Sequence, residues 1–176
     1  MCFCNIPAWG AQAKEPFEVQ RHFDVIGFVE THLSATAAAL KTSDMQRWGR
    51  RPFWSHAAPS LKSGSGTSGG ALIAPRLRFA CAPRSAVYFA DPVGNKFSGD
   101  DWVCTVFTAQ GFSYVAVLLY LVHSIGAAGI NLVRLSAIST CLLLLGLPFF
   151  ICTDWNTTLA QQASSGFLAL TGATIM

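Results

Sequence analysis

The fold of this chain is decided by the stretch Leu147-Pro148-Phe149-Phe150-Ile151-Cys152-Thr153-Asp154-Trp155-Asn156. Its apolar first half predicts a buried strand, and a carboxylate and an amide follow that strand directly. A second acidic residue, Glu30, follows another compact apolar run at residues 24–29. A group just past a strand is aimed by a rigid element and still left exposed, which suits catalysis. Carboxylate and amide oxygens are ligands that Mg²⁺ accepts, so this pattern indicates magnesium and phosphate chemistry.

The composition predicts one domain with a large core. The 176 residues suit a single domain, which we expect to span 1–176. The chain is 52% hydrophobic and only 12% charged, so it has ample apolar surface to bury. A net charge of +3 tolerates a polyanionic partner without indicating one.

Apolar runs and turn signals alternate along the chain in a way that favours an α/β layered domain. Two of the helices have recognisable caps, with Ser34 predicted to begin one and Asn131 another, while Gly49 and Gly146 follow their ends. The expected strands are 3–6, 24–29, 53–58, 71–74, 87–89, 102–108, 114–120 and 147–152, with 102–108 and 114–120 forming a hairpin. The expected helices are 15–23, 34–48, 131–146 and 158–170, and 60–70 is expected to be a loop.

The six cysteines are not arranged for disulfides or zinc. No Cys-x-x-Cys pair occurs, and no Cys/His spacing is typical of a metal site. The N-terminus lacks a basic start and a long apolar stretch, so we expect no signal peptide. Buried free thiols and a nuclear or cytoplasmic location, rather than a secreted one, are the interpretation that follows.

A membrane protein with two spans within 114–152 is an alternative interpretation. Residues 135–152 contain no charged side chain, and 114–130 is a second uncharged stretch, interrupted by His123. Two features argue against membrane-spanning helices. Gly146-Leu147-Pro148 would break a helix near its end, and 115–121 is short and rich in β-branched residues.

Basic and aromatic residues interleave in Arg47-Trp48-Gly49-Arg50-Arg51-Pro52-Phe53-Trp54. Arginine suits phosphate oxygens, and tryptophan can stack on a nucleobase. A helix that ends in cationic residues near its negative dipole has the same composition, and we favour this second interpretation.

Five short motifs, in order, resemble the endonuclease/exonuclease/phosphatase family, which includes apurinic/apyrimidinic endonucleases and the endonuclease domains of non-LTR retroelements. The matches are Asn5 at the end of the first strand, Glu30 in the segment 24–33, Ser68-Gly69-Gly70 before a strand, Tyr120 at the end of a central strand, and Thr153-Asp154-Trp155-Asn156. Val29 stands where the family has Gln, and Thr153 stands where it has Gly. The Pro and Asn that usually follow the Tyr are absent.

The resemblance implies a DNase I-like sandwich of two sheets and a role for each matched residue. Glu30 and Asn5 would form the site for Mg²⁺ (or Mn²⁺). Asp154 would orient or deprotonate the attacking water, with Asn156 holding Asp154 and the phosphate. Tyr120 would contact the scissile phosphate. The implied activity is metal-dependent hydrolysis of a phosphodiester, with nucleic acid, foremost DNA, as the partner.

One departure from the family pattern affects the expected activity. The family ends with a Ser-Asp-His motif on its last strands, and no Asp-His pair follows Asn156 here. The resemblance therefore implies a domain that is incomplete at its C-terminus, as in a retroelement-derived copy, with weak or no hydrolysis. A non-catalytic relic that keeps a phosphate-binding site is the remaining hypothesis.

Overall fold

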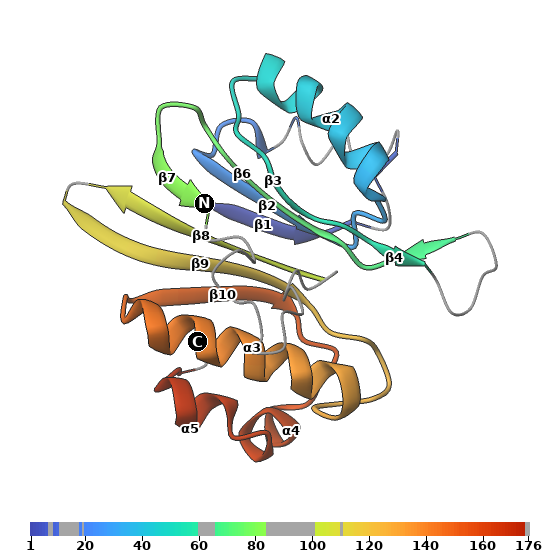
Figure 1. Ribbon diagram of the computed structural model, residues 1–176, viewed down its shortest axis with the longest axis vertical. Helices are drawn as coiled ribbons and strands as arrows, with labels where there is room; N and C mark the ends of the chain where they lie inside the picture. The colour runs from blue at the N-terminus through green and yellow to red at the C-terminus, as the bar shows by residue number, and fades with distance from the viewer. Residues whose placement is uncertain are drawn as a thin grey trace.

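The computed structural model describes residues 1–6, 9–10, 18, 20–59, 66–83, 101–109 and 111–174. Two four-stranded sheets pack face to face, with helix α2 on the outer face of one sheet and helices α3, α4 and α5 outside the other (Figure 1). This confirms the expected α/β sandwich of two sheets. The strand expected at 87–89 lies outside the described residues, as do residues 15–17 at the start of the helix expected over 15–23.

The first sheet has the order β1-β2-β6-β3. Strand β1 (Cys2–Asn5) runs parallel to β2 (Val25–Val29), and β6 (Ala71–Pro75) is antiparallel to both β2 and β3 (Phe53–Ser55). A separate pair, β4 (Ala58–Pro59) and β5 (Thr67–Ser68), extends from this sheet. The prediction of a loop over 60–70 is therefore wrong at Thr67–Ser68, which form β5.

The second sheet has the order β10-β9-β8-β7. Strands β8 (Trp102–Ala109) and β9 (Phe112–Tyr120) form the expected hairpin, and β7 (Ala80–Pro83) pairs with β8. Strand β10 (Phe149–Asp154) is parallel to β9, which places Asp154 beside Tyr120. The opening stretch of sequence thus forms the strand that its apolar residues predicted.

Alternate residues of each strand divide the core into an inner and two outer parts. Between the sheets lie Val25, Val29, Ala71, Ile73, Val103, Phe107, Ala116 and Leu118. Under α2, Ile26, Phe28, Leu72 and Ala74 pack with Met45, and under α3 the odd residues of β9 pack with Leu135, Ile138 and Leu142. Gly27 of β2 faces the inner layer, where a Cβ would collide with the ring of Phe3, so only glycine fits.

Helix α2 (Ala35–Arg47) begins and ends as its sequence predicts. The Ser34 hydroxyl caps its first turn by accepting from the N–H of Ala37 at 3.3 Å. Gly49 follows the helix with φ of +72°, a conformation that glycine adopts without strain.

Helix α3 (Gly129–Leu145) begins at a different residue from the predicted one. Ala128 is its N-cap, so the prediction of Asn131 is wrong. The Asn131 side chain is buried and holds the preceding loop instead, bonding to the N–H and the carbonyl of Val122 and to the carbonyl of Gly126 at 2.7–2.9 Å. The Asn131 side chain therefore bonds to the loop after β9 and does not cap the helix. Gly146 ends the helix in the left-handed conformation, as expected.

The last helical segment is two short helices, where one was expected over 158–170. Helix α4 (Leu159–Ser164) starts with a capping box between Thr158 and Gln161. Gly166, with φ of +75°, interrupts the helix before α5 (Phe167–Thr171).

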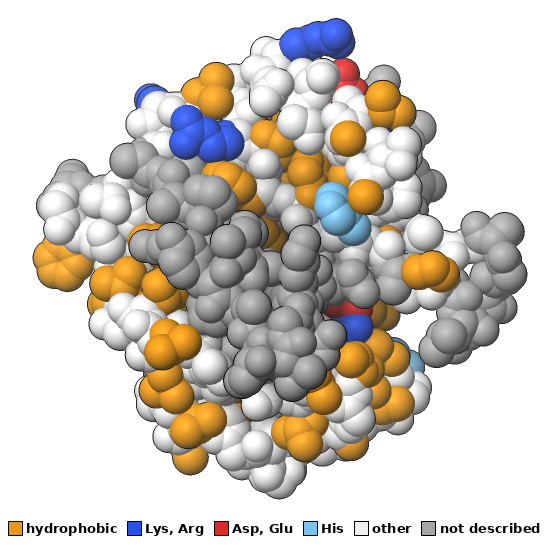
Figure 2. Space-filling model, in the orientation of Figure 1, with side chains coloured by type: hydrophobic (Ala, Val, Ile, Leu, Met, Phe, Trp, Pro, Cys, Tyr) orange, Lys and Arg blue, Asp and Glu red, His pale blue; other side chains and the backbone are white. Residues whose placement is uncertain are grey.

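The residues of the membrane alternative form part of the sandwich. Phe112–Tyr120 is a strand, and α3 packs on the sheet through Leu135, Ile138 and Leu142. In the described ranges, no helix combines the length and apolar character needed to cross a bilayer. Hydrophobic side chains are nevertheless exposed over the part of the molecule that holds α3–α5 (Figure 2), including Leu132, Val133 and Leu144.

The expectation of free thiols is confirmed for the five cysteines whose side chains are described. Cys104 and Cys141 are buried with their sulfurs 3.8 Å apart, in hydrogen-bond contact and not a disulfide. Cys2, Cys4 and Cys152 are half-buried.

Candidate active site at the ends of four strands

Four of the five predicted site residues come together where strands from both sheets end. Asn5 is the last residue of β1, and Glu30 follows β2 directly. Tyr120 and Asp154 are paired last residues of β9 and β10. Strand β1 is parallel to β2, and β9 is parallel to β10. The carboxyl ends of the two strands in each pair therefore lie side by side.

A hydrogen bond joins the two sheets at this edge. The side-chain amide of Asn5 donates from Nδ2 to Oδ2 of Asp154 at 2.9 Å. Both residues line a cavity of about 620 Å³ between the edge strands β1 and β10. The amide keeps its Oδ1 as an acceptor, so Asn5 can hold Asp154 and still present an oxygen to a cation.

Tyr120 connects Glu30 to the same group. Burial, a hydrogen bond with Glu30 and the nearby negative charges of Glu30 and Asp154 raise the pKa of Tyr120 to about 12. The phenol is therefore neutral at any physiological pH and remains a hydrogen-bond donor. A neutral donor between two carboxylates is suited to contact a phosphate oxygen.

Asn156 lies beside this group with contacts that differ from its expected role. Its Nδ2 donates to the carbonyl of Leu121 at 2.9 Å, and its Oδ1 is 3.2 Å from Nδ1 of His123. Asn156 therefore ties the loop after β9 to the loop after β10, with φ of +42°. One N–H of its amide is given to Leu121, so Asn156 fixes the chain two residues from Asp154. Its expected hold on Asp154 and the phosphate stays a prediction.

Sequence reasoning did not assign His123 to the site. Its signal was its position three residues after the strand-ending Tyr120. The ring is exposed and its contact with Asn156 places an ionisable group at the edge of the site.

The backbone after Glu30 is fixed to the Ser68-Gly69-Gly70 motif. The N–H of Thr31 donates to the carbonyl of Gly70 at 3.3 Å, and the N–H of His32 donates to Gly69 at 2.9 Å. Glu30 itself has φ of +59°, an uncommon conformation for a residue with a side chain. Such a conformation is maintained only where the surroundings determine it, and here these bonds do so.

His32 follows Glu30 closely in sequence, and its side chain contacts the backbone of Thr67. Its Nδ1 is 2.6 Å from the carbonyl of Thr67, whose hydroxyl donates to the carbonyl of His32 at 2.6 Å. The pair fastens the loop after β2 to β5. His32 therefore supports the backbone that carries Glu30.

The buried ion pair between Asp101 and Arg134 supports the site, and the sequence analysis did not predict it. Asp101 and Arg134 pair with side-chain exposures of only 4% and 11%. Asp101 also accepts from the N–H of Gly70 at 3.1 Å, and its carbonyl accepts from the N–H of Tyr120 at 2.8 Å. One residue thus connects the glycine motif of the first sheet to Tyr120 of the second.

The donor set fits a magnesium ion of the kind that is completed by water and substrate. In the part of the chain that the structure describes, no group of three or more His, Cys, Asp or Glu side chains could hold a metal ion. Glu30 and the Oδ1 of Asn5 offer one carboxylate and one amide oxygen. Mg²⁺ in proteins is often bound by one or two carboxylates and takes its remaining ligands from water and phosphate.

The fold of the sandwich is that of the DNase I-like endonuclease/exonuclease/phosphatase proteins. The chain is similar to the catalytic domain of human nocturnin, with a TM-score of 0.59 and 15% identity over 89% of this chain and 59% of nocturnin's. It is similar to the endonuclease domain of TRAS1, a telomere-specific non-LTR retrotransposon, with a TM-score of 0.59 and 12% identity over 97% of this chain and 69% of that one. The 3′ phosphatase NExo from Neisseria, bound to a product DNA hairpin, has a TM-score of 0.58 and 12% identity over 96% and 69%.

These similarities lie in the fold and not in the sequence. No protein-family model and no curated protein sequence matches the chain. The chain spans less than two thirds of the nocturnin chain and about two thirds of the other two.

Proposed function

We propose that this chain is a metal-dependent, nuclease-like phosphodiesterase. The observation that carries the proposal is the hydrogen bond between Asn5 and Asp154, which joins the ends of two sheets in one group with Glu30 and Tyr120. The structural neighbours TRAS1, an endonuclease domain, and NExo, a 3′ phosphatase, support the same chemistry.

Each residue has a defined part in this proposal. Glu30 and Asn5 would hold Mg²⁺ or Mn²⁺, which neutralises charge that develops on phosphoryl oxygens. Asp154 accepts a proton from the attacking water, and the Asn5 amide fixes the orientation of its carboxylate. Tyr120 has a single O–H, given to Glu30 in the free protein, which it would turn to a phosphate oxygen when substrate is bound. Asn156 holds the two loops at their correct separation.

Nucleic acid is the substrate class that we propose, and DNA is its first member. Among the similar structures, the TRAS1 domain is the endonuclease of a retrotransposon, and NExo is bound to a DNA product. A retroelement origin for this chain is part of the proposal.

The proposal is tested with fluorescent duplex DNA that is intact, nicked or contains an abasic site, incubated with Mg²⁺ and with EDTA. We expect metal-dependent cleavage that is lost in Glu30→Ala and kept in Asp44→Ala, which removes a carboxylate on α2. Equal rates in wild type and Glu30→Ala contradict the proposal. Salt-sensitive DNA binding with no cleavage at any metal concentration would instead favour the phosphate-binding relic.

A further inference from the structure

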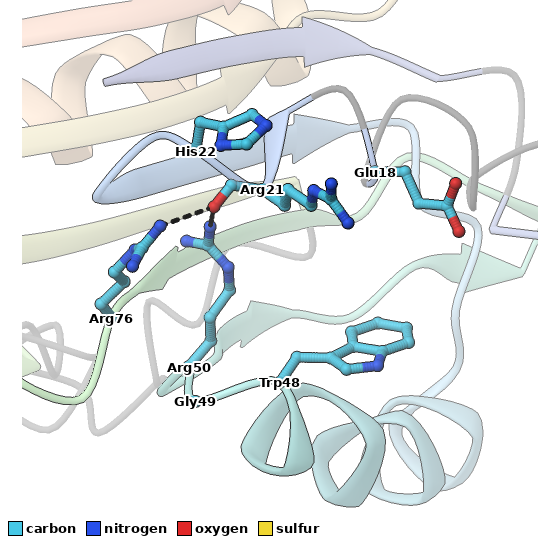
Figure 3. Close-up of a pocket in the computed structure, with 7 residues that line it drawn as sticks. All are labelled: Glu18, Arg21, His22, Trp48, Gly49, Arg50 and Arg76. Atoms are coloured by element: carbon cyan, nitrogen blue, oxygen red, sulfur yellow. Dashed lines mark hydrogen bonds between the residues drawn. The ribbon is translucent and has the colours of Figure 1, made fainter.

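A second cavity lies at the other end of the sandwich from Asn5 and Asp154. It has a volume of about 630 Å³ and is lined by Glu18, Arg21, His22, Trp48, Arg50 and Arg76 (Figure 3). Arg76 follows the end of β6 and lies beside Asp24, which precedes β2. Glu30 follows the opposite end of β2. At about 3.3 Å per residue, the six steps from Asp24 to Glu30 separate the two ends by roughly 20 Å.

The lining carries an excess of positive charge. Arg21, Arg50 and Arg76 contribute three guanidinium groups, against the single carboxylate of Glu18 among the described lining residues. The nearby carboxylate of Asp24 already pairs with both Arg76, at 3.7 Å, and Arg78. Burial and the charge of Arg76 lower the pKa of Arg50, which shows that these cations repel one another. A bound anion would relieve that repulsion.

Two of the arginines are held in place by backbone carbonyls. Arg50 donates to Ala74 at 3.0 Å, to Phe23 at 2.9 Å and to Arg21 at 3.2 Å, while Arg76 donates to the same Arg21 carbonyl at 2.8 Å. Fixed groups lose little conformational entropy when they bind a ligand. A guanidinium has five N–H donors, so Arg76 keeps donors for an anion beyond the one given to Arg21.

An aromatic surface lies across the cavity from these charges. Trp48 is 47% exposed, and Figure 3 shows the side chain of Arg21 extending away from Arg50 and Arg76, toward Glu18 and to a position above Trp48 in this view. Exposed tryptophan binds flat rings by stacking, and arginine binds phosphate. The cavity volume is within the usual range for small-molecule sites.

We propose that this cavity is a binding site for a nucleoside monophosphate, separate from the active site. Its phosphate contacts Arg21 within the positive potential that Arg50 and Arg76 add to the cavity, and its base stacks on Trp48. The interleaved basic and aromatic residues at 47–54 thereby have a binding role through Trp48, beyond favouring a helix terminus. This site does not depend on the hydrolytic function.

The test measures binding of adenosine monophosphate and of inorganic phosphate to the full chain by calorimetry. Trp48→Leu is expected to weaken nucleotide binding about tenfold and to leave phosphate binding unchanged. Arg21→Gln is expected to weaken both. Glu18→Gln is expected to strengthen both, because it removes the carboxylate among the described lining residues.

Two control variants make the result specific to this cavity. Arg47→Gln removes the same charge as Arg21→Gln, from a side chain that is 77% exposed and pairs with Asp44 on α2. Glu30→Gln alters the active site and is expected to leave nucleotide binding unchanged. The proposal is overturned if the nucleotide does not bind at millimolar concentration, if Trp48→Leu binds it as wild type does, or if Arg21→Gln and Arg47→Gln have equal effects. Circular dichroism confirms that each variant is folded.

Discussion

The carboxylate of Asp101 occupies the space in which a side chain at Gly69 would stand. A Cβ built on Gly69 overlaps Oδ1 of Asp101, the same atom that accepts the N–H of Gly70. At Gly70, a Cβ would lie 2.6 Å from Oγ1 of Thr31. The Ser68-Gly69-Gly70 motif is thus required because Asp101 and Thr31 approach the backbone that fixes Glu30.

Gly69→Ala is therefore expected to destabilise the protein strongly. Both Gly69 and Gly111 have φ near +80°, but a Cβ on Gly111 meets nothing within 4 Å. Gly111→Ala should cost about 1 kcal/mol for its backbone conformation alone, whereas Gly69→Ala should cost at least about 2 kcal/mol more. Urea unfolding of the two variants measures the difference. Equal losses would show that Asp101 does not occupy this space.

Tyr120 should titrate later than the other described tyrosine. Its pKa of about 12 depends on burial and on Glu30, whereas the pKa of Tyr114 is raised by burial alone. Ultraviolet titration of tyrosinate should lose its latest step in Tyr120→Phe, and Glu30→Gln should move that step to lower pH. A step that Glu30→Gln leaves in place would contradict the contact between Tyr120 and Glu30.

The same pKa has a consequence for stability at alkaline pH. The folded state holds the phenolic proton of Tyr120 more tightly than the unfolded chain, whose tyrosines titrate near pH 10. The stabilisation is complete below about pH 10 and is lost as the pH rises toward 12. Tyr120→Phe should therefore show less loss of thermal stability over this interval than wild type does.

Removal of Glu30, the proposed metal ligand, should change the magnesium requirement before it changes the fold. Glu30 is half-buried and its backbone is held by the neighbouring bonds to Gly69 and Gly70. Glu30→Gln should raise the Mg²⁺ concentration for half-maximal hydrolysis by about tenfold or more, because it replaces a charged ligand with a neutral one. The measurement is the rate against Mg²⁺ concentration, with Asp44→Asn on α2 as the matched control. An unchanged curve for Glu30→Gln would place the metal elsewhere.

Much of the fold could be predicted because its signals are local. The apolar runs at 24–29 and 147–152 form β2 and β10, and Ser34 and Gly49 end α2 as expected. The motif order also predicted that Asn5, Glu30, Tyr120 and Asp154 meet. Each of these residues ends a strand, and strand ends are readable from the sequence alone.

The remaining features depend on contacts between distant parts of the chain. Asp101 and Arg134 are 33 positions apart, and nothing near either residue indicates that they pair in a buried position. Asn131 resembled a helix cap, but the loop after β9 supplied three better partners for its amide. His123 and Asn156 meet only because β9 and β10 are neighbours, an order that the strand pattern alone does not determine.

The central claim is that Asn5 and Asp154 act as one hydrolytic unit, and single-turnover cleavage by a double-mutant cycle tests it most directly. Asn5→Ala and Asp154→Ala should each lower the Mg²⁺-dependent rate by about a hundredfold, and the double variant should be no slower than the slower single variant. Asn156→Ala, which alters the adjacent loop contact, should have a smaller effect. Rate losses that multiply in the double variant, or single variants as fast as wild type, would contradict the account.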